Sequence, residues 1–305
     1  MRKGMIIIML IGISLFCQSL QVSGEEADVG TTSAQFLKIS KGARAIGMGG
    51  AFNAIADDVS TLYWNPAGLG QIKGLEATFS YISHFQDINF GSIGLVQPTR
   101  IGAFGIGVVY LGHKDIPGYD VRAVSIGDYS ANSMCVSLAY GKRFGKVILF
   151  GGSFNYISEK IENEDASGFA VDLGLFCKVP IKDLSLGLVI KNLGQDIKFV
   201  KEDNPLPLNF KLGLSFKPLT SLILAADFTI PQDNEFYGGI GVEYWIKNIM
   251  ALRCGYTTGP QDEGPGVSGG IGFNISRFVV DYAFSPYGNL GENHALSLLV
   301  RFNLI

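Results

Sequence analysis

After about residue 74 the chain alternates between apolar residues and residues that are polar or very small. The segment that begins at residue 207 shows the pattern most clearly, with apolar side chains at Leu208, Phe210, Leu212, Leu214 and Phe216. A period of two predicts β-strands, because successive side chains of a strand point to opposite faces. We count about 14 such segments by this criterion. They begin near residues 75, 88, 101, 129, 146, 167, 183, 207, 220, 236, 248, 267, 277 and 294.

The length of the segments and their connections predict how the strands are arranged. Most segments run for about 9 to 12 residues, which is the length a tilted strand needs to cross a bilayer. Tight connections such as Gln97 to Arg100 alternate with long ones such as Gly112 to Asp128 and Ser158 to Ala166. Alternation of short turns and long loops is typical of outer-membrane barrels. We therefore predict an all-β fold, a 14-stranded antiparallel transmembrane β-barrel with a short N-terminal hatch segment in its lumen.

A soluble β-sandwich would also alternate, but the less apolar face here is rich in glycine and serine, whereas a solvated face would carry more Lys, Glu and Thr. Charge also differs between the two kinds of connection. The long ones carry Glu159, Glu162, Glu164, Asp165, Glu202, Asp203, Asp262 and Glu263. The tight ones carry Arg100, Lys142, Arg143, Lys182, Lys217 and Lys247. The two ends of the predicted barrel therefore differ in the sign of their charge.

Composition narrows the class of protein. The 305 residues are 47% hydrophobic and only 17% charged, with a formal net charge of -3 and 40 glycines. This composition excludes a disordered chain and disfavours a nucleic-acid partner, which would call for a basic surplus. The start of the chain has Arg2 and Lys3, then an apolar stretch from Met5 to Phe16, then small residues before the end of the segment at Gly24. This order predicts a cleaved signal peptide.

Three parts of the chain are therefore predicted: a signal peptide over residues 1–24, a hatch over 25–74 and a barrel over 75–305. The hatch part does not alternate. Asp57 or Asp58 is a candidate N-cap for a short helix, which Asn65 and Pro66 should end, since the residue before proline avoids the helical region. The rest of this part is rich in glycine and predicts short turns.

The stretch from Ala43 to Leu69 resembles the N-terminal hatch of FadL-type long-chain fatty-acid transporters. It is similar above all to the PorV/PorQ branch, where the strings Gly-Ala-Arg-Ala-Ile-Gly-Met-Gly-Gly-Ala-Phe and Tyr-Trp-Asn-Pro-Ala-Gly are typical. The resemblance implies 14 strands, a plugged lumen and transport of hydrophobic molecules past the hatch. It also implies that the hatch turn is formed by Asn65, Pro66, Ala67 and Gly68. The chain departs from common barrels at its end, which lacks the usual terminal aromatic residue.

Nine charged residues fall on the face predicted to line the lumen. They are Glu76, Asp172, Lys191, Lys211, Asp227, Glu243, Arg253, Asp281 and Arg301. Their mixed sign predicts that they pair with one another or with Arg44, Asp57 and Asp58 of the hatch. The glycines of the same face have two interpretations, room for the hatch and relief of strain as the barrel bends.

We find no catalytic motif, no cofactor motif and no metal-ligand spacing, so no enzymatic activity, cofactor or metal is expected. The predicted location is the outer membrane of a diderm bacterium, with outer-membrane lipid and lipopolysaccharide as neighbours. The first functional hypothesis is passive uptake of hydrophobic small molecules. The alternative is a PorV-like interaction protein that serves as shuttle or docking partner for secretion-system components or secreted cargo.

Overall fold

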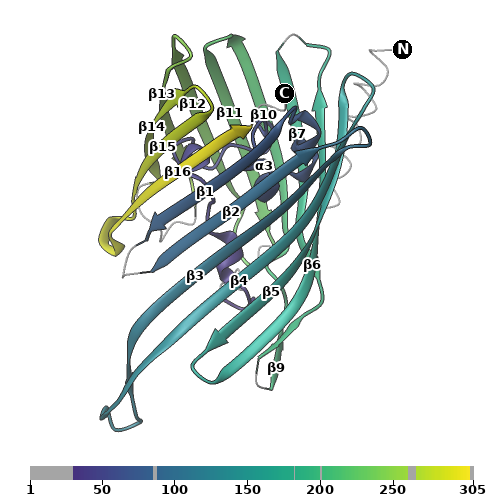
Figure 1. The fold of residues 1–305 in the computed structure, drawn as a ribbon. Helices are drawn as coiled ribbons and strands as arrows, with labels where there is room; N and C mark the ends of the chain where they lie inside the picture. Colours follow the sequence, from purple (N-terminus) through teal and green to yellow (C-terminus); the bar gives the residue numbers. More distant parts are fainter. Residues whose placement is uncertain (1–29, 85–87, 182, 200, 260–265, 303–305) are drawn as a thin grey trace.

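The computed structural model describes residues 30–84, 88–181, 183–199, 201–259 and 266–302. The predicted signal peptide lies outside the described residues. Figure 1 shows the described chain as one cylinder of strands with short helices among them. No helix among the described residues is long and apolar enough to cross a membrane.

Fourteen strands close the barrel, and each is antiparallel to both neighbours. The strands are β1 (Leu75–Ser83), β2 (Asn89–Pro98), β3 (Ala103–Tyr119), β4 (Ser125–Phe144), β5 (Ile148–Ile161), β6 (Glu164–Lys178), β7 (Leu184–Gly194), β10 (Asn209–Leu219), β11 (Leu222–Pro231), β12 (Tyr237–Ile246), β13 (Met250–Thr257), β14 (Val267–Ile275), β15 (Phe278–Pro286) and β16 (Glu292–Phe302). The short pair β8 (Ile197–Phe199) and β9 (Glu202–Asn204) lies between β7 and β10, and the turn η4 (Gly288–Leu290) precedes β16. The predicted fold class is confirmed.

The wall has its apolar side outside and its polar side inside. Outward residues such as Ile93 and Leu138 are more than half exposed, at 58% and 57%. Many inward residues are small or charged, others such as Leu149 and Ile157 are apolar, and both kinds are buried. This distribution is the reverse of a soluble sandwich, in which apolar side chains face a second sheet. The hydrophobic residues of the chain therefore cover the outer surface, and a second, buried set from the hatch segment and the inner wall forms an apolar core inside the lumen.

One predicted loop is wrong, because residues of the stretch Gly112 to Asp128 extend β3 and β4 and make them 17 and 20 residues long. Pro117 and Gly118 favour turns locally. Among the described residues β2 pairs with β3 only as far as Gly112, and no other described strand pairs with this edge of β3 beyond that point. Proline is tolerated on a free strand edge because its missing N–H removes no ladder hydrogen bond there.

The predicted loop Ser158 to Ala166 is also a hairpin, closed by the two residues between β5 and β6. Within this hairpin Lys160 and Asp165 lie directly opposite each other in the ladder. Opposite charges at facing positions stabilise a strand pair. As a result β3 to β6 form a taller wall on one side of the barrel, seen at the bottom of Figure 1.

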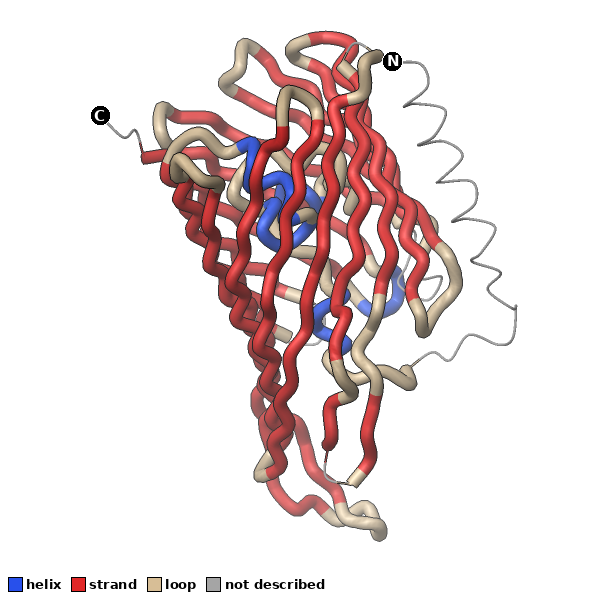
Figure 2. The backbone as a smooth tube through the Cα atoms, turned by 90° about the vertical axis from the view of Figure 1, so that its right-hand side faces the viewer, coloured by secondary structure: helices blue, strands red, loops and turns tan. Residues whose placement is uncertain are grey.

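The hatch segment, defined here as residues 30–74, lies inside the cylinder and is shown by the helices in Figure 2. Its helices are η1 (Gln35–Lys38), α2 (Ala43–Ile46), α3 (Thr61–Trp64) and η2 (Pro66–Gln71). Helix α3 ends before Asn65, whose backbone is extended, as the following proline requires. The predicted N-cap is wrong: Ser60 occupies that position, and the carboxylate of Asp58 instead accepts a hydrogen bond from the Ser60 N–H at 2.9 Å.

Inward glycines of the wall lie directly against the hatch segment. A Cβ at Gly241 would come within 2.9 Å of Met48, and one at Gly187 would come within 2.8 Å of Asn53. Real Cβ atoms do not approach other heavy atoms this closely. Of the two interpretations of these glycines, the one that leaves room for an inserted segment therefore explains both positions.

Gly49 shows the tightest fit from the side of the hatch segment. Its φ is +65°, and a Cβ there would lie 2.6 Å from the backbone nitrogen of Tyr256 and 2.8 Å from the Ile240 carbonyl oxygen. Both the left-handed backbone and the close approach require glycine. We expect Gly49→Ala to lower the unfolding temperature of the barrel. The unfolding temperature is measured from the change in electrophoretic mobility in detergent after heating.

Gly145→Ala is the matched control for Gly49→Ala. Gly145 has a nearly identical φ of +63° but no heavy atom within 4 Å of the added Cβ. Its substitution should cost only the strain of a left-handed alanine, about 1 kcal/mol. Equal losses of stability in the two variants would contradict a steric fit between Gly49 and the wall.

Candidate functional site: the hatch segment and its attachments to the lumen wall

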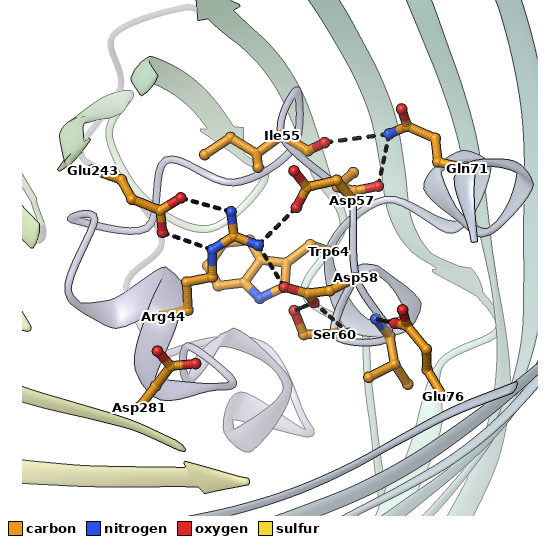
Figure 3. A network of polar contacts seen from close by, with 12 residues as sticks. Arg44, Ile55, Asp57, Asp58, Ser60, Trp64, Gln71, Glu76, Glu243 and Asp281 are labelled. Atoms are coloured by element: carbon orange, nitrogen blue, oxygen red, sulfur yellow. Dashed lines mark hydrogen bonds and ion pairs between the residues drawn. The ribbon is translucent and has the colours of Figure 1, made fainter. Parts of the chain in front are cut away.

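Arg44 of α2 is the centre of the polar contacts between the hatch segment and the wall. Its Nε and Nη2 donate to the two carboxylate oxygens of Glu243 on β12, both at 2.8 Å. Its Nη1 donates to Asp57 at 2.7 Å and to Asp58 at 2.6 Å. Figure 3 shows the guanidinium between these three carboxylates. A bidentate arginine–carboxylate pair fixes both distance and orientation, so Arg44 holds α2 at one height on β12.

Arg253 completes this group from the wall. Its Nε donates to Glu243 at 2.6 Å, and its Nη1 donates to Asp281 on β15 at 2.7 Å. The indole Nε1 of Trp245 also donates to Glu243 at 2.9 Å. Glu243 is completely buried, and burying a carboxylate costs much free energy unless it is paired and hydrogen-bonded. The neighbouring donors from both the hatch segment and the wall supply that compensation.

Asp57 joins the group at its more exposed side, where Lys217 lies 3.2 Å from its carboxylate. Burial opposes ionisation of Asp57, but Arg44 and Lys217 outweigh this effect and lower the pKa of Asp57 below its ordinary value. We call Arg44, Asp57, Asp58, Glu243, Arg253 and Asp281 the hatch clamp.

Other predicted lumen charges contact the hatch segment at separate points. Asp227 on β11 accepts hydrogen bonds from the backbone N–H groups of Phe52 and Asn53, both at 2.9 Å. Glu76 on β1 accepts the Val59 N–H at 3.0 Å. These carboxylates bind backbone donors, so they position the hatch chain without the help of a hatch side chain.

The lysines of the predicted set face the helix α3. Lys191 donates to the carbonyl oxygen of Tyr63 at 2.7 Å, and the Lys211 ammonium lies 5.4 Å from the centre of the Trp64 ring. The remaining two members bond within the wall: Asp172 accepts from the Asn192 N–H at 2.8 Å, and Arg301 lies 3.4 Å from Glu76.

The Asn-Pro-Ala-Gly turn packs on the opposite wall. Asn65 donates to the Asn53 carbonyl at 2.9 Å and to Leu175 of β6 at 3.3 Å, and its side-chain oxygen accepts from the Ala67 N–H at 3.1 Å. Pro66 begins η2, where its missing N–H costs nothing. The helix η2 packs on β4, β5 and β6. A Cβ at Gly68 would meet the Ala56 carbonyl oxygen at 2.5 Å, so this turn needs its glycine.

Sequence reasoning missed the first residues of the hatch segment. Thr32, Gln35 and Lys38 all donate to Asp233, which follows β11 and is 1% exposed. The Ala34 N–H donates to Glu159 of β5 at 3.0 Å. Neither partner lies in an alternating segment that marks it as facing the lumen, so no sequence signal pointed to these contacts. Asp233 and Glu159 lie toward the end of the barrel with the long hairpins, whereas η2 lies at the end with the tight turns. The hatch segment therefore runs the length of the lumen.

Lys41 is a second residue that the sequence did not single out. It is 5% exposed and donates to the Leu37 carbonyl, and the carbonyl oxygen of Lys41 accepts a hydrogen bond from the Trp64 indole at 2.9 Å. Burial, followed by the charge of Lys191, lowers the pKa of Lys41 well below its ordinary value. Among the described residues, no three His, Cys, Asp or Glu side chains lie together in a way that could hold a metal.

Residues 16–153 match an uncharacterised protein family (UPF0164), over less than half of the chain. No curated protein matches the sequence. The fold is similar to solved structures. The toluene transporter TbuX of Ralstonia pickettii has a TM-score of 0.64 at 16% identity, over 87% of this chain and 99% of that one.

Two further structures show the same fold. A deltaS2 mutant of the TodX monoaromatic hydrocarbon channel has a TM-score of 0.64 at 14% identity, over 86% of this chain and 99% of that chain. A Pseudomonas aeruginosa FadL homologue has a TM-score of 0.60 at 12% identity, over 87% and 99%. The protein therefore has the FadL-like fold of a 14-stranded barrel, and the neighbouring structures named for an activity are transporters or channels. The narrower assignment to the PorV/PorQ branch stays a prediction.

We expect Arg44→Gln to loosen the hatch segment, because the variant leaves Asp57 and Asp58 without their shared cation and removes one of the two cations on buried Glu243. Breaking a buried ion pair costs about 3–5 kcal/mol. Hydrogen exchange of residues 43–69, measured by mass spectrometry in detergent, should rise strongly while exchange of the barrel strands stays unchanged.

Lys217→Gln is the matched control, since Lys217 touches the same Asp57 from a side chain that is 42% exposed. A partly exposed ion pair contributes about 0–1 kcal/mol. Exchange in this variant should remain close to that of the unmodified protein. Unchanged exchange in Arg44→Gln as well would show that the hatch clamp does not hold the hatch segment.

Proposed function

We propose that the protein is an outer-membrane channel for hydrophobic small molecules, closed by the hatch segment, which must shift for passage. The observation that carries this proposal is the hatch clamp. It ties the hatch segment to the lumen wall through ion pairs and hydrogen bonds, beside the apolar contact between the two. Ion pairs and hydrogen bonds of this kind can be exchanged for water, which gives the clamped part of the hatch segment a route to a second position.

The outer surface and the fold support the location. The exposed apolar side chains of the wall suit a hydrocarbon environment, since a barrel leaves no unpaired strand edge inside a membrane. We place the basic tight turns at the periplasmic end and the tall wall of β3 to β6 at the outer end. The same proposal includes a cleaved signal peptide over residues 1–24. It also includes outer-membrane lipid and lipopolysaccharide as the neighbours of the barrel.

The substrate class rests on two supports. TbuX is named a toluene transporter and TodX a monoaromatic hydrocarbon channel, and both share this fold at low identity. In this chain, the hatch segment places buried apolar side chains such as Phe52 and Leu69 in the lumen, and such a lining suits hydrophobic solutes better than polar ones. Enzymatic activity is not part of the proposal.

Uptake into liposomes tests the channel. Liposomes that contain the purified protein should take up toluene and a long-chain fatty acid faster than empty liposomes, and they should exclude glucose. A variant that lacks residues 43–69 should admit glucose as well, since the lumen would then be open. Absence of uptake of both hydrophobic probes, with no change on deletion, would overturn the channel.

The tall wall favours a second candidate function, that of a shuttle or docking partner in protein secretion. The hairpin tip between β3 and β4 exposes Tyr119, Val121 and Val124, at 63%, 103% and 58%. Exposed apolar residues at a tip are typical of protein contacts. We hypothesise that this tip meets secreted cargo or a secretion component.

Photo-crosslinking at Val121 tests this second candidate in the native organism. A discrete adduct with a secreted or secretion-machinery protein, absent with the crosslinker at Gly145 of a tight turn, is the expected result. Recovery of no protein adduct at Val121, or of the same adducts at both positions, would leave the channel as the function.

A further inference from the structure

The outer surface of the taller wall carries a notch at Gly152. Gly152 faces outward on β5, where it pairs with Tyr140 of β4 and Leu173 of β6. The notch has a cavity volume of ≈ 380 Å³, and its lining includes Phe104, Leu138, Phe154 and Val171. Because glycine has no side chain, the floor of the notch is backbone and its walls are aromatic and aliphatic.

The walls of the notch are held in place by contacts within the outer surface. The Phe104 and Tyr140 rings lie 5.0 Å apart, and Phe154 stacks on Phe169 at 5.3 Å. The Tyr140 hydroxyl donates to the carbonyl of Ile101 at 2.6 Å. This bond attaches the turn that carries Arg100 to one wall of the notch.

Cations lie next to the notch on the side of the tight turns. Lys142 follows Tyr140 on the same face of β4, about 7 Å along the strand. Its ammonium lies 5.6 Å from the Phe144 ring, so the side chain runs along the outer surface. Arg100 is exposed in the neighbouring turn. In the described tight turns of the barrel, the charges are Arg100, Lys146, Lys247, Arg277 and one acid, Asp183.

We propose that the notch and its two adjacent cations form a binding site for one phospholipid with an anionic headgroup. An acyl chain lies across Gly152 between Tyr140 and Phe154, and the phosphate is held by Lys142 and Arg100. An apolar slot beside uncompensated cations at the end of the membrane-spanning wall complements this chemistry. The inference rests on the proposed insertion in a membrane.

Native mass spectrometry of the purified protein in detergent tests the site with added phosphatidylglycerol and phosphatidylcholine. The first phosphatidylglycerol should bind more tightly than phosphatidylcholine. The double variant Arg100→Gln/Lys142→Gln should weaken phosphatidylglycerol binding at least about fivefold, which corresponds to the roughly 1 kcal/mol that one cation contributes at an anionic lipid. It should leave phosphatidylcholine unchanged. Gly152→Leu should weaken both lipids, because its side chain fills the slot.

Two matched controls accompany these variants. Lys247→Gln/Arg277→Gln removes two cations from tight turns on the other side of the barrel. Gly269→Leu adds the same side chain at another position of the wall, on β14 between Cys254 and Phe284, where an added Cβ has only the Arg253 carbonyl oxygen nearby, at 3.9 Å. Both controls should bind phosphatidylglycerol as the unmodified protein does.

Equal losses in test and control variants, or equal affinity for the two phospholipids, would overturn the site. Tighter binding of lipopolysaccharide than of phosphatidylglycerol, lost in Arg100→Gln/Lys142→Gln, would assign a different lipid and also overturn it. The proposed channel is judged separately. Arg100→Gln/Lys142→Gln should retain toluene uptake in liposomes. Absence of toluene uptake by the unmodified protein would refute the channel, whereas the order of lipid affinities measured in detergent would still stand.

Discussion

The buried carboxylate of Glu243 is the constraint on which the arrangement of the lumen depends. A charged group inside a barrel is far from bulk water, and it is stable only where cations and hydrogen-bond donors surround it. Arg253 and Trp245 come from the wall itself, but the bidentate partner comes from Arg44 in the hatch segment. The wall is therefore electrostatically incomplete without the hatch segment, and the hatch segment in turn brings Asp57 and Asp58, which need the same arginine. Neither part satisfies its buried charges alone.

The glycine content of the wall belongs to the same coupling. A β-strand whose inward positions carried side chains would keep the hatch backbone several ångströms away, out of reach of short carboxylates such as Asp227. Glycine at positions such as Gly241 and Gly187 lets the hatch backbone lie against the wall. Main-chain N–H groups of Phe52 and Asn53 can then donate directly to Asp227. Small residues set the distance, and charged residues fix the position at that distance.

A period of two in the sequence predicts three features of the fold: the number of strands, the face that each alternating residue occupies and the lumen position of the charged residues. In a closed antiparallel wall, every second residue of a strand points inward and the residues between them point outward. The contact partners do not follow from this period. Whether Arg44 meets Glu243 or Asp227 depends on the height at which α2 lies, which no local pattern encodes.

The two misassigned loops show a related limit. Pro117 favours a turn locally, but the free edge of β3 is a property of where β2 ends, and the charged stretch after Ser158 is stabilised by cross-strand pairing that only the register reveals.

The hatch segment is attached in two physically different ways. On the side of β12 to β16 the close fit of Gly49 against Ile240 and Tyr256 is joined by the ion pairs and hydrogen bonds of the hatch clamp. The strength of these polar contacts falls when water or salt enters. On the side of β4 to β6 the helix η2 is held mainly by close fit, since a Cβ at Gly141 would lie 2.6 Å from the Pro66 carbonyl oxygen, and by one hydrogen bond from Asn65 to Leu175 at 3.3 Å. Close packing has no intermediate position and is insensitive to salt. A displacement of the hatch segment would therefore begin at the hatch clamp, where each broken contact can be replaced by water, while η2 stays seated against the tall wall.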